Sequence, residues 1–256
     1  MSRSNRIVGF IGILVILGVA CLASILYGSK AISASDVFLA MQGLGDHETY
    51  VVVAEQRVPR TWVVIIVGAA LGVAGALMQA LTRNPLADPG ILGINAGASL
   101  AVVTAVAFLG IHGITAYVWF ALVGATLAAI GVYLLGSAGR ANVTPAKLTL
   151  AGVAISMAIS AMVQTVLLSN QEAFNEFRYW ASGSVEGRGW DVFATVAPFI
   201  VIGLILALIT APALNALALG DDTGKALGVQ VTRTRTLVII GVTLLAGAAT
   251  AAVGPI

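Results

Sequence analysis

Long apolar stretches alternate with short polar ones along almost the whole chain. A helix needs roughly 20 apolar residues to cross a hydrocarbon core of about 30 Å. Seven segments approach that length, at residues 7–27, 61–82, 91–110, 114–136, 147–168, 192–211 and 236–254. The pattern predicts an all-α polytopic membrane protein, with seven transmembrane helices in one domain over residues 1–256.

The sharpest break in this pattern separates the second and third segments. It reads Asn84-Pro85-Leu86-Ala87-Asp88-Pro89-Gly90, and each proline removes a backbone donor and restricts the residue before it. We therefore expect a structural turn here. Gly68 and Gly72 before the turn, like Gly93 and Gly97 after it, have the spacing that lets helix backbones approach closely, although glycine is also simply common in membrane helices.

Composition supports a membrane protein and limits its chemistry. The chain is 59% hydrophobic and only 9% charged, whereas a soluble domain carries about 25% charged residues. Cys21 is the single cysteine, which excludes a disulfide within the chain and a cysteine-based metal site. We expect a multi-pass protein of the cell (plasma or inner) membrane, in contact with lipid, with no resident metal, cofactor or nucleic acid.

The charges between the segments predict the orientation. With the N-terminus in the cytoplasm, that side holds eight basic and three acidic residues, and the outer side five basic and eight acidic ones. Basic residues accumulate on the cytoplasmic side of membrane proteins, so we predict a cytoplasmic N-terminus. The eight are Arg3, Arg6, Arg83, Arg140, Lys147, Lys225, Arg233 and Arg235.

One helix face in the fifth segment is polar. Gly152, Ser156, Ser160 and Gln164 recur at every fourth residue, and so lie on one side of the helix. Such a face can make hydrogen bonds to a neighbouring helix or line a passage. Ile155 and Ile159, on flanking surfaces, are expected to be packed or to face lipid.

The stretch 212–235 between the last two segments contains a short helix signal. Asp221, Asp222 or Thr223 could cap a helix that exposes Ala226 and Leu227 before Gly228 ends it. This helix could lie on the bilayer surface or bind a partner. The run from Gly220 to Lys225 is one residue short of a phosphate-binding loop and lacks the following Ser or Thr, so we do not expect ATP hydrolysis by this chain.

Several motifs, in order along the chain, closely resemble those of the FecCD-type permeases, the membrane subunits of ABC importers for iron-siderophores, haem and vitamin B12. They are Arg57-Val58-Pro59-Arg60, Gly68 to Gln79, Asn84 to Pro89 with Leu92-Gly93 and Gly97-Ala98, Leu150 to Ala154, Tyr179-Trp180 with Gly183-Ser184, Leu217 to Gly220 with Ala226 to Gly228, and Gly254-Pro255-Ile256.

The resemblance implies partners and roles for these residues. The expected partners are a second permease subunit, cytoplasmic ATP-binding subunits and an extracytoplasmic substrate-binding protein. It implies that Arg57 and Arg60 point outward and dock the binding protein; anchoring to lipid headgroups is the alternative. It favours a translocation pathway along the Gly152–Gln164 face. It assigns ATPase coupling to Leu217, Leu219, Gly220, Asp221, Ala226, Leu227 and Gly228.

The resemblance most favours a ferric siderophore as substrate, with haem or vitamin B12 as alternatives. Family members continue for roughly three further spans, so the chain is expected to be C-terminally incomplete. A secondary transporter and an intramembrane enzyme are the competing classes. The first usually needs an ionisable group inside the membrane, and the second needs a nucleophile with its base or clustered metal ligands; no segment core offers either.

Overall fold

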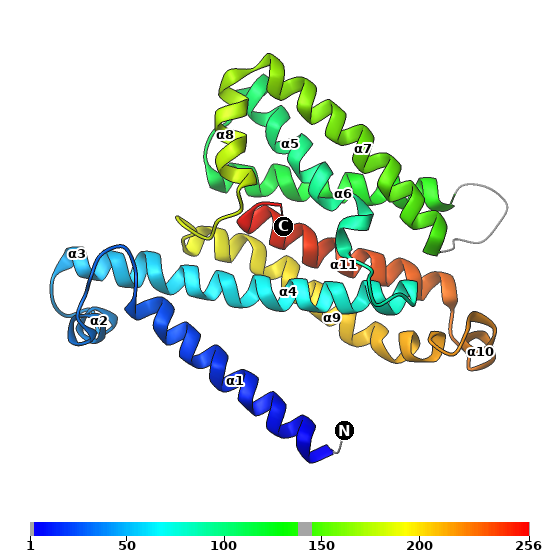
Figure 1. The fold of residues 1–256 in the computed structure, drawn as a ribbon, viewed down its shortest axis with the longest axis horizontal. Helices are drawn as coiled ribbons and strands as arrows, with labels where there is room; N and C mark the ends of the chain where they lie inside the picture. Colours follow the sequence, from blue (N-terminus) through cyan, green and yellow to red (C-terminus); the bar gives the residue numbers. More distant parts are fainter. Residues whose placement is uncertain (1–2, 138–144, 256) are drawn as a thin grey trace. The chain divides into compact units, whose positions relative to one another are not determined.

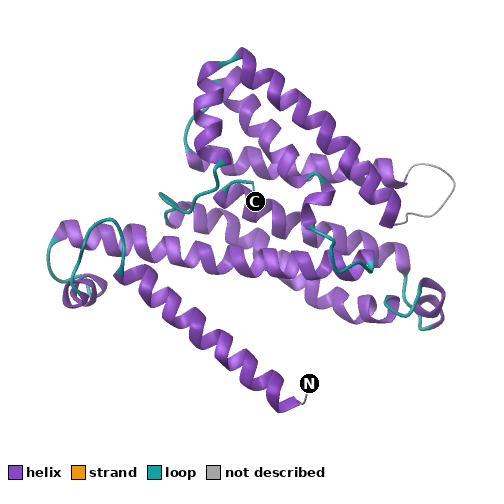
Figure 2. Ribbon diagram, in the orientation of Figure 1, coloured by secondary structure: helices purple, strands orange, loops and turns teal. Residues whose placement is uncertain are grey.

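The computed structural model describes residues 3–137 and 145–255, and every element in this part of the chain is helical (Figures 1 and 2). Arg140 and Ile256, which the sequence motifs and the charge count include, lie outside the described residues. The elements are α1 (Arg3–Leu26), α2 (Ala34–Met41), α3 (His47–Tyr50), the π-helix η1 (Val51–Arg57), α4 (Val58–Thr82), the 3₁₀-helix η2 (Pro89–Leu92), α5 (Ile94–Leu109), α6 (Ile114–Ser137), α7 (Pro145–Ser169), α8 (Gln171–Ala181), α9 (Trp190–Leu217), α10 (Asp221–Ala226) and α11 (Val231–Val253).

Each predicted segment contains a helix, and six of the described helical runs are long and apolar enough to span a membrane. The helix of the third segment, α5, has only 16 residues, or about 24 Å at 1.5 Å per residue. The all-α polytopic class is therefore confirmed. The count of seven spans and the side of the N-terminus stay predictions.

Two boundaries differ from the sequence prediction. The helix of the second segment does not begin at residue 61, because helix is continuous from His47 through α3 and η1 into α4. The helix of the sixth segment does not end before Pro212, because α9 includes both Pro198 and Pro212 and continues to Leu217. Proline is tolerated inside membrane helices where nearby groups satisfy the freed backbone.

The chain forms two compact units. The first comprises residues 1–65 and 186–190, and the second comprises residues 66–185 and 191–256. In the first unit, Val37, Ala40 and Val53 form a small core, against which Ile25 and Leu26 from the end of α1 pack. Ser33 caps α2 through a hydrogen bond from the Asp36 amide.

The second unit is built around α6 and α11. α6 packs against α5, α7 and α11, and most of α11 from Val238 onward is buried. α5 and α6 cross where Gly97 meets Gly124, and a Cβ on either glycine would collide with the backbone carbonyl of the other. The close approach predicted for Gly97 is confirmed. Gly68 and Gly72 differ, since no atom of the chain lies near the position of a Cβ at either residue.

Arg57 closes the C-terminal end of α1. Its Nη1 donates hydrogen bonds to the carbonyls of Ile25 (3.0 Å) and Leu26 (2.9 Å), and its Nη2 donates to that of Lys30 (2.5 Å). The last carbonyls of a helix have no partner within the helix, so the guanidinium supplies donors that α1 itself lacks. Gly28 passes directly beside it, and a Cβ there would lie 2.7 Å from Nη2.

These contacts overturn the prediction that Arg57 points outward to a binding protein. Its side chain is buried, with 4% of the residue exposed, and three of its N–H donors are engaged with the end of α1. Pro59 is buried as well and does not aim the two arginines outward. Arg60 is half-buried and donates one hydrogen bond, to the carbonyl of Ser24 (3.1 Å).

We predict that Arg57→Ala loosens the end of α1. Hydrogen bonds to a charged group contribute about 1.5–3 kcal/mol each, and this substitution removes three while leaving their acceptors in place. Amide hydrogen exchange across residues 24–32, measured by mass spectrometry in detergent, should accelerate at least about tenfold. Arg60→Ala, which removes a single bond to Ser24, is the matched control and should change exchange much less. Equal exchange in the two variants would contradict the role assigned to Arg57.

Candidate functional site

A polar pocket lies in the second unit between α5, α7 and α8. It has a volume of about 410 Å³ and includes three of the four residues of the predicted polar face, Ser156, Ser160 and Gln164. The facing wall comes from α5 and η2, and Phe177 of α8 closes one side. The remaining lining residues are Gly90, Asn95, Ala96, Ser99 and Val163.

Gly152, the fourth predicted residue, has a different role. A Cβ at this position would collide with the carbonyl oxygen of Ile91, so glycine lets α7 pack directly on η2. Gly152 is buried in that contact and does not line the pocket. Of the four residues that share this periodicity, Gly152 packs against η2 and the other three line the cavity.

The isoleucines of α7 lie in a separate apolar site. Ile155 and Ile159 line a cavity of about 470 Å³ together with residues of α5 and α6, among them Phe120 and Leu127. The prediction that these two side chains pack apart from the polar face agrees with this arrangement.

Two polar residues of the pocket were missed by the sequence reasoning. Asn95 and Ser99 are four residues apart on α5, and this spacing in an apolar helix was the available signal. Asn95 is held in place by α11, since the Thr250 hydroxyl donates to its Oδ1 at 2.8 Å. The pocket thus offers hydroxyl and amide groups, which exchange hydrogen bonds with a solute without carrying charge.

The predicted turn is present, and its last residue, Gly90, lines the polar pocket. Asn84 Oδ1 accepts a hydrogen bond from the Leu86 amide (3.0 Å), and Asp88 Oδ1 accepts one from the Gly90 amide (2.6 Å). Pro89 begins η2, where a missing N–H is harmless. Gly93 then adopts a left-handed conformation, φ +71°, which ends η2 and starts α5.

Segment 212–235 contains a short helix held by one carboxylate. Asp221, the first residue of α10, pairs with Arg83 (2.5 Å), which follows α4, and with Arg235 (2.8 Å) in the first turns of α11. The predicted capping by Asp221, Asp222 or Thr223 is wrong, because the N-cap is Gly220, at φ +116°, with no side-chain cap. Asp221 is used for ion pairing instead.

The environment keeps Asp221 charged. Burial alone would raise the pKa of its carboxyl, but the hydrogen bonds and charges of Arg83 and Arg235 outweigh burial and lower that pKa below its usual value. Because the pKa of Asp221 is lower in the folded protein than in the unfolded chain, its ion pairs stabilise the folded state at every pH above the ordinary aspartate pKa of about 3.9. This stabilisation is lost only when the pH falls through the lowered pKa of the folded protein. The ion pairs therefore persist at neutral pH.

The predicted coupling residues divide into exposed and buried ones. Leu219 (69%) and Leu227 (63%) are strongly exposed, and Ala226 is exposed beside them. Leu217, in contrast, is buried and packs against Gly224 inside the segment. Gly228 has φ +85° and follows the end of α10, as predicted. Exposed apolar side chains are therefore present at the positions that the sequence predicted, and their place outside the membrane stays a prediction.

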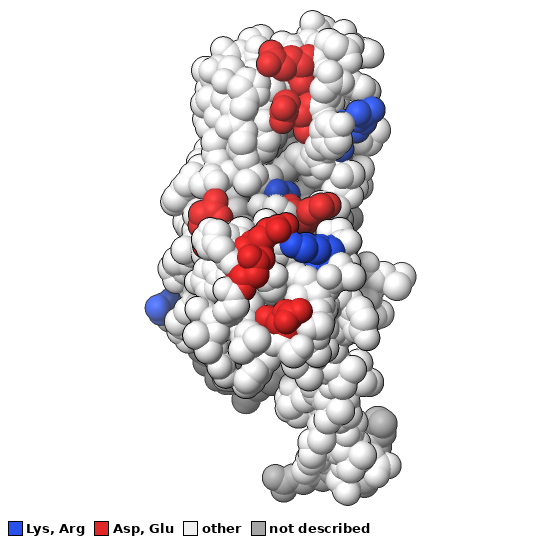
Figure 3. Space-filling model, turned by 90° about the vertical axis from the view of Figure 1, so that its left-hand side faces the viewer, with Lys and Arg blue, Asp and Glu red and all other residues white. Residues whose placement is uncertain are grey.

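Acidic side chains gather at the opposite end of this unit. Figure 3 shows red carboxylates on the face that carries α8. Glu172 and Glu176 belong to α8, and Asp191 begins the second unit's part of α9. Glu176 accepts a hydrogen bond from the Tyr117 hydroxyl (2.9 Å), and Asp191 accepts one from that of Thr115 (2.7 Å). In the described chain there is no cluster of three or more metal-ligating side chains.

The chain matches known transport proteins along nearly its whole length. The model of the FecCD transport family matches residues 14–256. The ferric enterobactin transport system permease protein FepD of Escherichia coli (strain K12) is 40% identical over 252 residues, which cover 98% of this chain and 75% of the relative. The Fe(3+)-citrate import system permease protein YfmD of Bacillus subtilis (strain 168) is 38% identical, with 99% of this chain and 75% of the relative covered.

A solved structure has the same fold. It is an inward-facing conformation of a metal-chelate type ABC transporter, with a TM-score of 0.80, 23% identity and coverage of 96% of this chain and 76% of that one. At this identity the structural match concerns the fold alone. The family match and the curated relatives together show that the chain belongs to the FecCD transport family.

Proposed function

We propose that the chain takes up a ferric siderophore, received from an extracytoplasmic binding protein and driven by a separate ATPase subunit. Its family makes it an iron-chelate permease subunit of an ABC importer in the inner membrane, and not an enzyme. The observation that carries the substrate is the similarity to permeases named for ferric enterobactin and Fe(3+)-citrate. Haem and vitamin B12 are the alternatives within the family.

The polar pocket supports a pathway along α5 and α7. Ser156, Ser160 and Gln164 place hydroxyl and amide groups on a continuous strip, and Asn95 and Ser99 face them. Neutral polar groups provide weak, replaceable hydrogen bonds, which suit a solute that must leave as readily as it enters. Gly152 contributes to this pathway only by fixing α7 on η2.

The exposed residues of segment 212–235 support coupling to the ATPase. Leu219, Ala226 and Leu227 present apolar surface next to a charged region formed by Asp221, Arg83 and Arg235. Apolar anchors surrounded by polar groups are typical of protein interfaces. The remaining assigned residues, Leu217, Gly220 and Gly228, shape the segment.

The partners of a FecCD permease include an ATPase, a binding protein and a second permease subunit. Docking of the binding protein at Arg60 stays a prediction. The Arg57 guanidinium instead binds carbonyls at the end of α1.

Substrate choice is tested by uptake into proteoliposomes. The complete gene product, reconstituted with its ATPase and binding protein, should import ⁵⁵Fe-labelled ferric siderophore at least about tenfold faster with ATP than with a non-hydrolysable analogue, because the family couples transport to ATP hydrolysis. Labelled haem and cobalamin serve as matched substrates. Import of cobalamin or haem in preference to every ferric siderophore would refute the substrate assignment.

The pathway proposal predicts that water reaches Ser160 and Gln164 but not Ile155 and Ile159. Single cysteines at these positions, in a Cys21→Ser background, are to be treated with a water-soluble thiol reagent in the assembled transporter. Cysteines replacing Ser160 and Gln164 should react roughly tenfold faster, because thiolate chemistry requires hydrated access. Similar rates for both pairs would contradict a pathway at the polar pocket.

The coupling proposal predicts that Leu227→Asp disrupts binding of the ATPase. The substitution replaces an exposed apolar side chain with a charged one. Burying an unpaired carboxylate at the interface costs more free energy than the original apolar contact contributes to binding. Co-purification of ATPase with permease should fall at least about tenfold. Asp222→Ala, on the same helix and fully exposed, is the control and should retain the ATPase. Retention in Leu227→Asp together with normal uptake would rule out coupling through this residue.

A further inference from the structure

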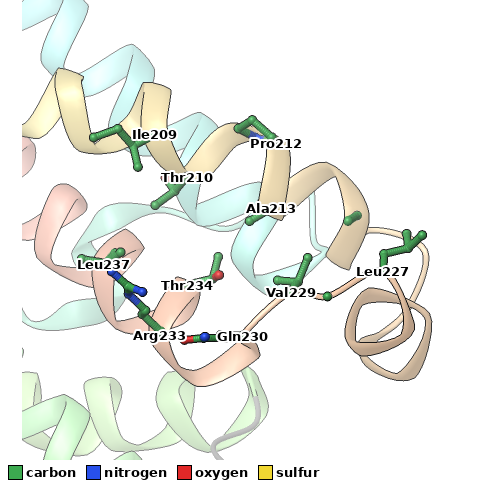
Figure 4. Close-up of a pocket in the computed structure, with 12 residues that line it drawn as sticks. Ile209, Thr210, Pro212, Ala213, Leu227, Val229, Gln230, Arg233, Thr234 and Leu237 are labelled. Carbon is green, nitrogen blue, oxygen red and sulfur yellow. The ribbon is translucent and has the colours of Figure 1, made fainter.

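A further pocket in this unit lies between the end of α9 and the start of α11, near α10 (Figure 4). It has a volume of about 510 Å³, within the usual range of ligand sites. One wall is apolar and includes Ile209 and Pro212 of α9 and Leu237 of α11. The other wall carries Gln230, Arg233 and Thr234 from the start of α11.

The polar side chains of this pocket have unused hydrogen-bonding capacity. Arg233 makes no ion pair or hydrogen bond within the described residues, whereas Lys225 and Arg235 on the same segment are both paired with aspartates. Thr234 is 93% buried, since only 7% of it is exposed, and among described residues its hydroxyl has no partner. Figure 4 shows Thr234 directed from α11 into the pocket toward α9.

The backbone adds further donors to the same wall. α11 begins at Val231 with no side-chain cap on its first turn, so its first N–H groups lack partners inside the helix. The positive end of the helix dipole also favours an anion there. Among the residues that the structure describes, no acidic side chain lines the pocket, and the nearest ones along the chain, Asp221 and Asp222, are already paired with cations.

The position of the pocket along the helices indicates which anion would fit. Ile209 lies eight residues before the end of α9 and Leu237 six residues after the start of α11, which corresponds to about 12 Å and 9 Å along two candidate membrane spans. Ile209 and Leu237 lie just inside the ends of the predicted spans 192–211 and 236–254, whereas Gln230, Arg233 and Thr234 lie outside them. The predicted spans therefore place the apolar wall at the edge of the acyl chains and the polar wall at the level of the headgroups. A ligand that matches both walls has a phosphate joined to an apolar body.

We propose that this pocket is a binding site for the phosphate of an anionic phospholipid headgroup. Arg233 supplies the charge, and the Thr234 hydroxyl, the Gln230 amide and the first turn of α11 supply neutral donors. The glycerol and first acyl carbons lie along Ile209, Pro212 and Leu237. Basic pockets between membrane helices are known recognition sites for lipid headgroups. Lipid bound here would lie beside Leu227 and Gly228, which also line the pocket.

Native mass spectrometry of the complete permease in detergent tests this site. Phosphatidylglycerol and phosphatidylcholine are to be titrated onto the delipidated wild-type protein and onto Arg233→Gln, Thr234→Val and Arg178→Gln. Arg178 is exposed on α8 at the opposite end of the unit, so its variant changes the net charge equally without touching the pocket. Thr234→Val removes the hydroxyl and nearly keeps the side-chain shape.

The wild-type protein should bind phosphatidylglycerol in preference to phosphatidylcholine. Arg233→Gln should weaken that binding about fivefold, in line with one basic contact to a lipid headgroup. Thr234→Val should weaken it as well, and Arg178→Gln should not. Equal phosphatidylglycerol binding by wild type and Arg233→Gln, with the variant folded by size-exclusion chromatography, would overturn the proposal.

Inorganic phosphate distinguishes a lipid from a free anion as the source of the phosphate. Millimolar phosphate should leave the bound phosphatidylglycerol largely in place, because phosphate lacks the apolar body that the second wall accepts. Complete displacement by phosphate at those concentrations, or Arg233-dependent binding of phosphate without any binding of phosphatidylglycerol, would overturn the assignment to lipid.

Discussion

The fold depends on satisfying backbone polar groups in a chain that offers few polar side chains and, within a bilayer, no water. Regular helix pairs the backbone N–H and C=O groups along most of the chain. The positions that need another partner are those at which the helical hydrogen-bond pattern is interrupted. At η1 the hydrogen bonds shift to the fifth residue, as in the bond from the Val58 amide to the Val53 carbonyl. In that pattern the amide of residue 59 would donate to the carbonyl of Ala54, but residue 59 is a proline and has no N–H. The indole N–H of Trp190 donates to this carbonyl instead, at 3.3 Å. Arg57 likewise donates hydrogen bonds to carbonyls at the end of α1 that have no partner in the helix.

Close packing of the helices is the second constraint, and it determines where polar side chains can face one another. Gly97 and Gly124 bring α5 and α6 into backbone contact, and Gly152 brings α7 onto the carbonyl of Ile91 in η2. With α7 fixed in this way, its next turns carry Ser156, Ser160 and Gln164 past Asn95 and Ser99 of α5. The neutral pocket is therefore a consequence of where small residues allow contact.

The sequence predicted the helical class and the polar face because both depend on local periodicity. It also predicted the turn at Asn84–Gly90, where two prolines and two side-chain acceptors act on neighbouring residues. It did not predict the role of Arg57, because the three carbonyls that this residue binds lie 27 to 32 residues away along the chain. Asp221 was misinterpreted for the same reason: its partner Arg83 is 138 residues distant, and a local pattern favours a cap over an ion pair. The end of the sixth segment was also predicted too early, since α9 continues through exposed Pro212 to Leu217.

The pairing of Asp221 also has a mechanical consequence for segment 212–235. The carboxylate joins α10 to the residue that follows α4 and to the first turns of α11, so three elements share one charge. A partner that displaces α10 must either break two ion pairs at once or move Arg83 and Arg235 together with it. Because the two pairs act on the same group, the loss of one leaves the other less constrained, and their contributions are not independent. Under the proposed coupling, a displacement of Leu227 would reach the end of α4 and the start of α11 through this one carboxylate, without an ionisable group in the apolar cores of those helices.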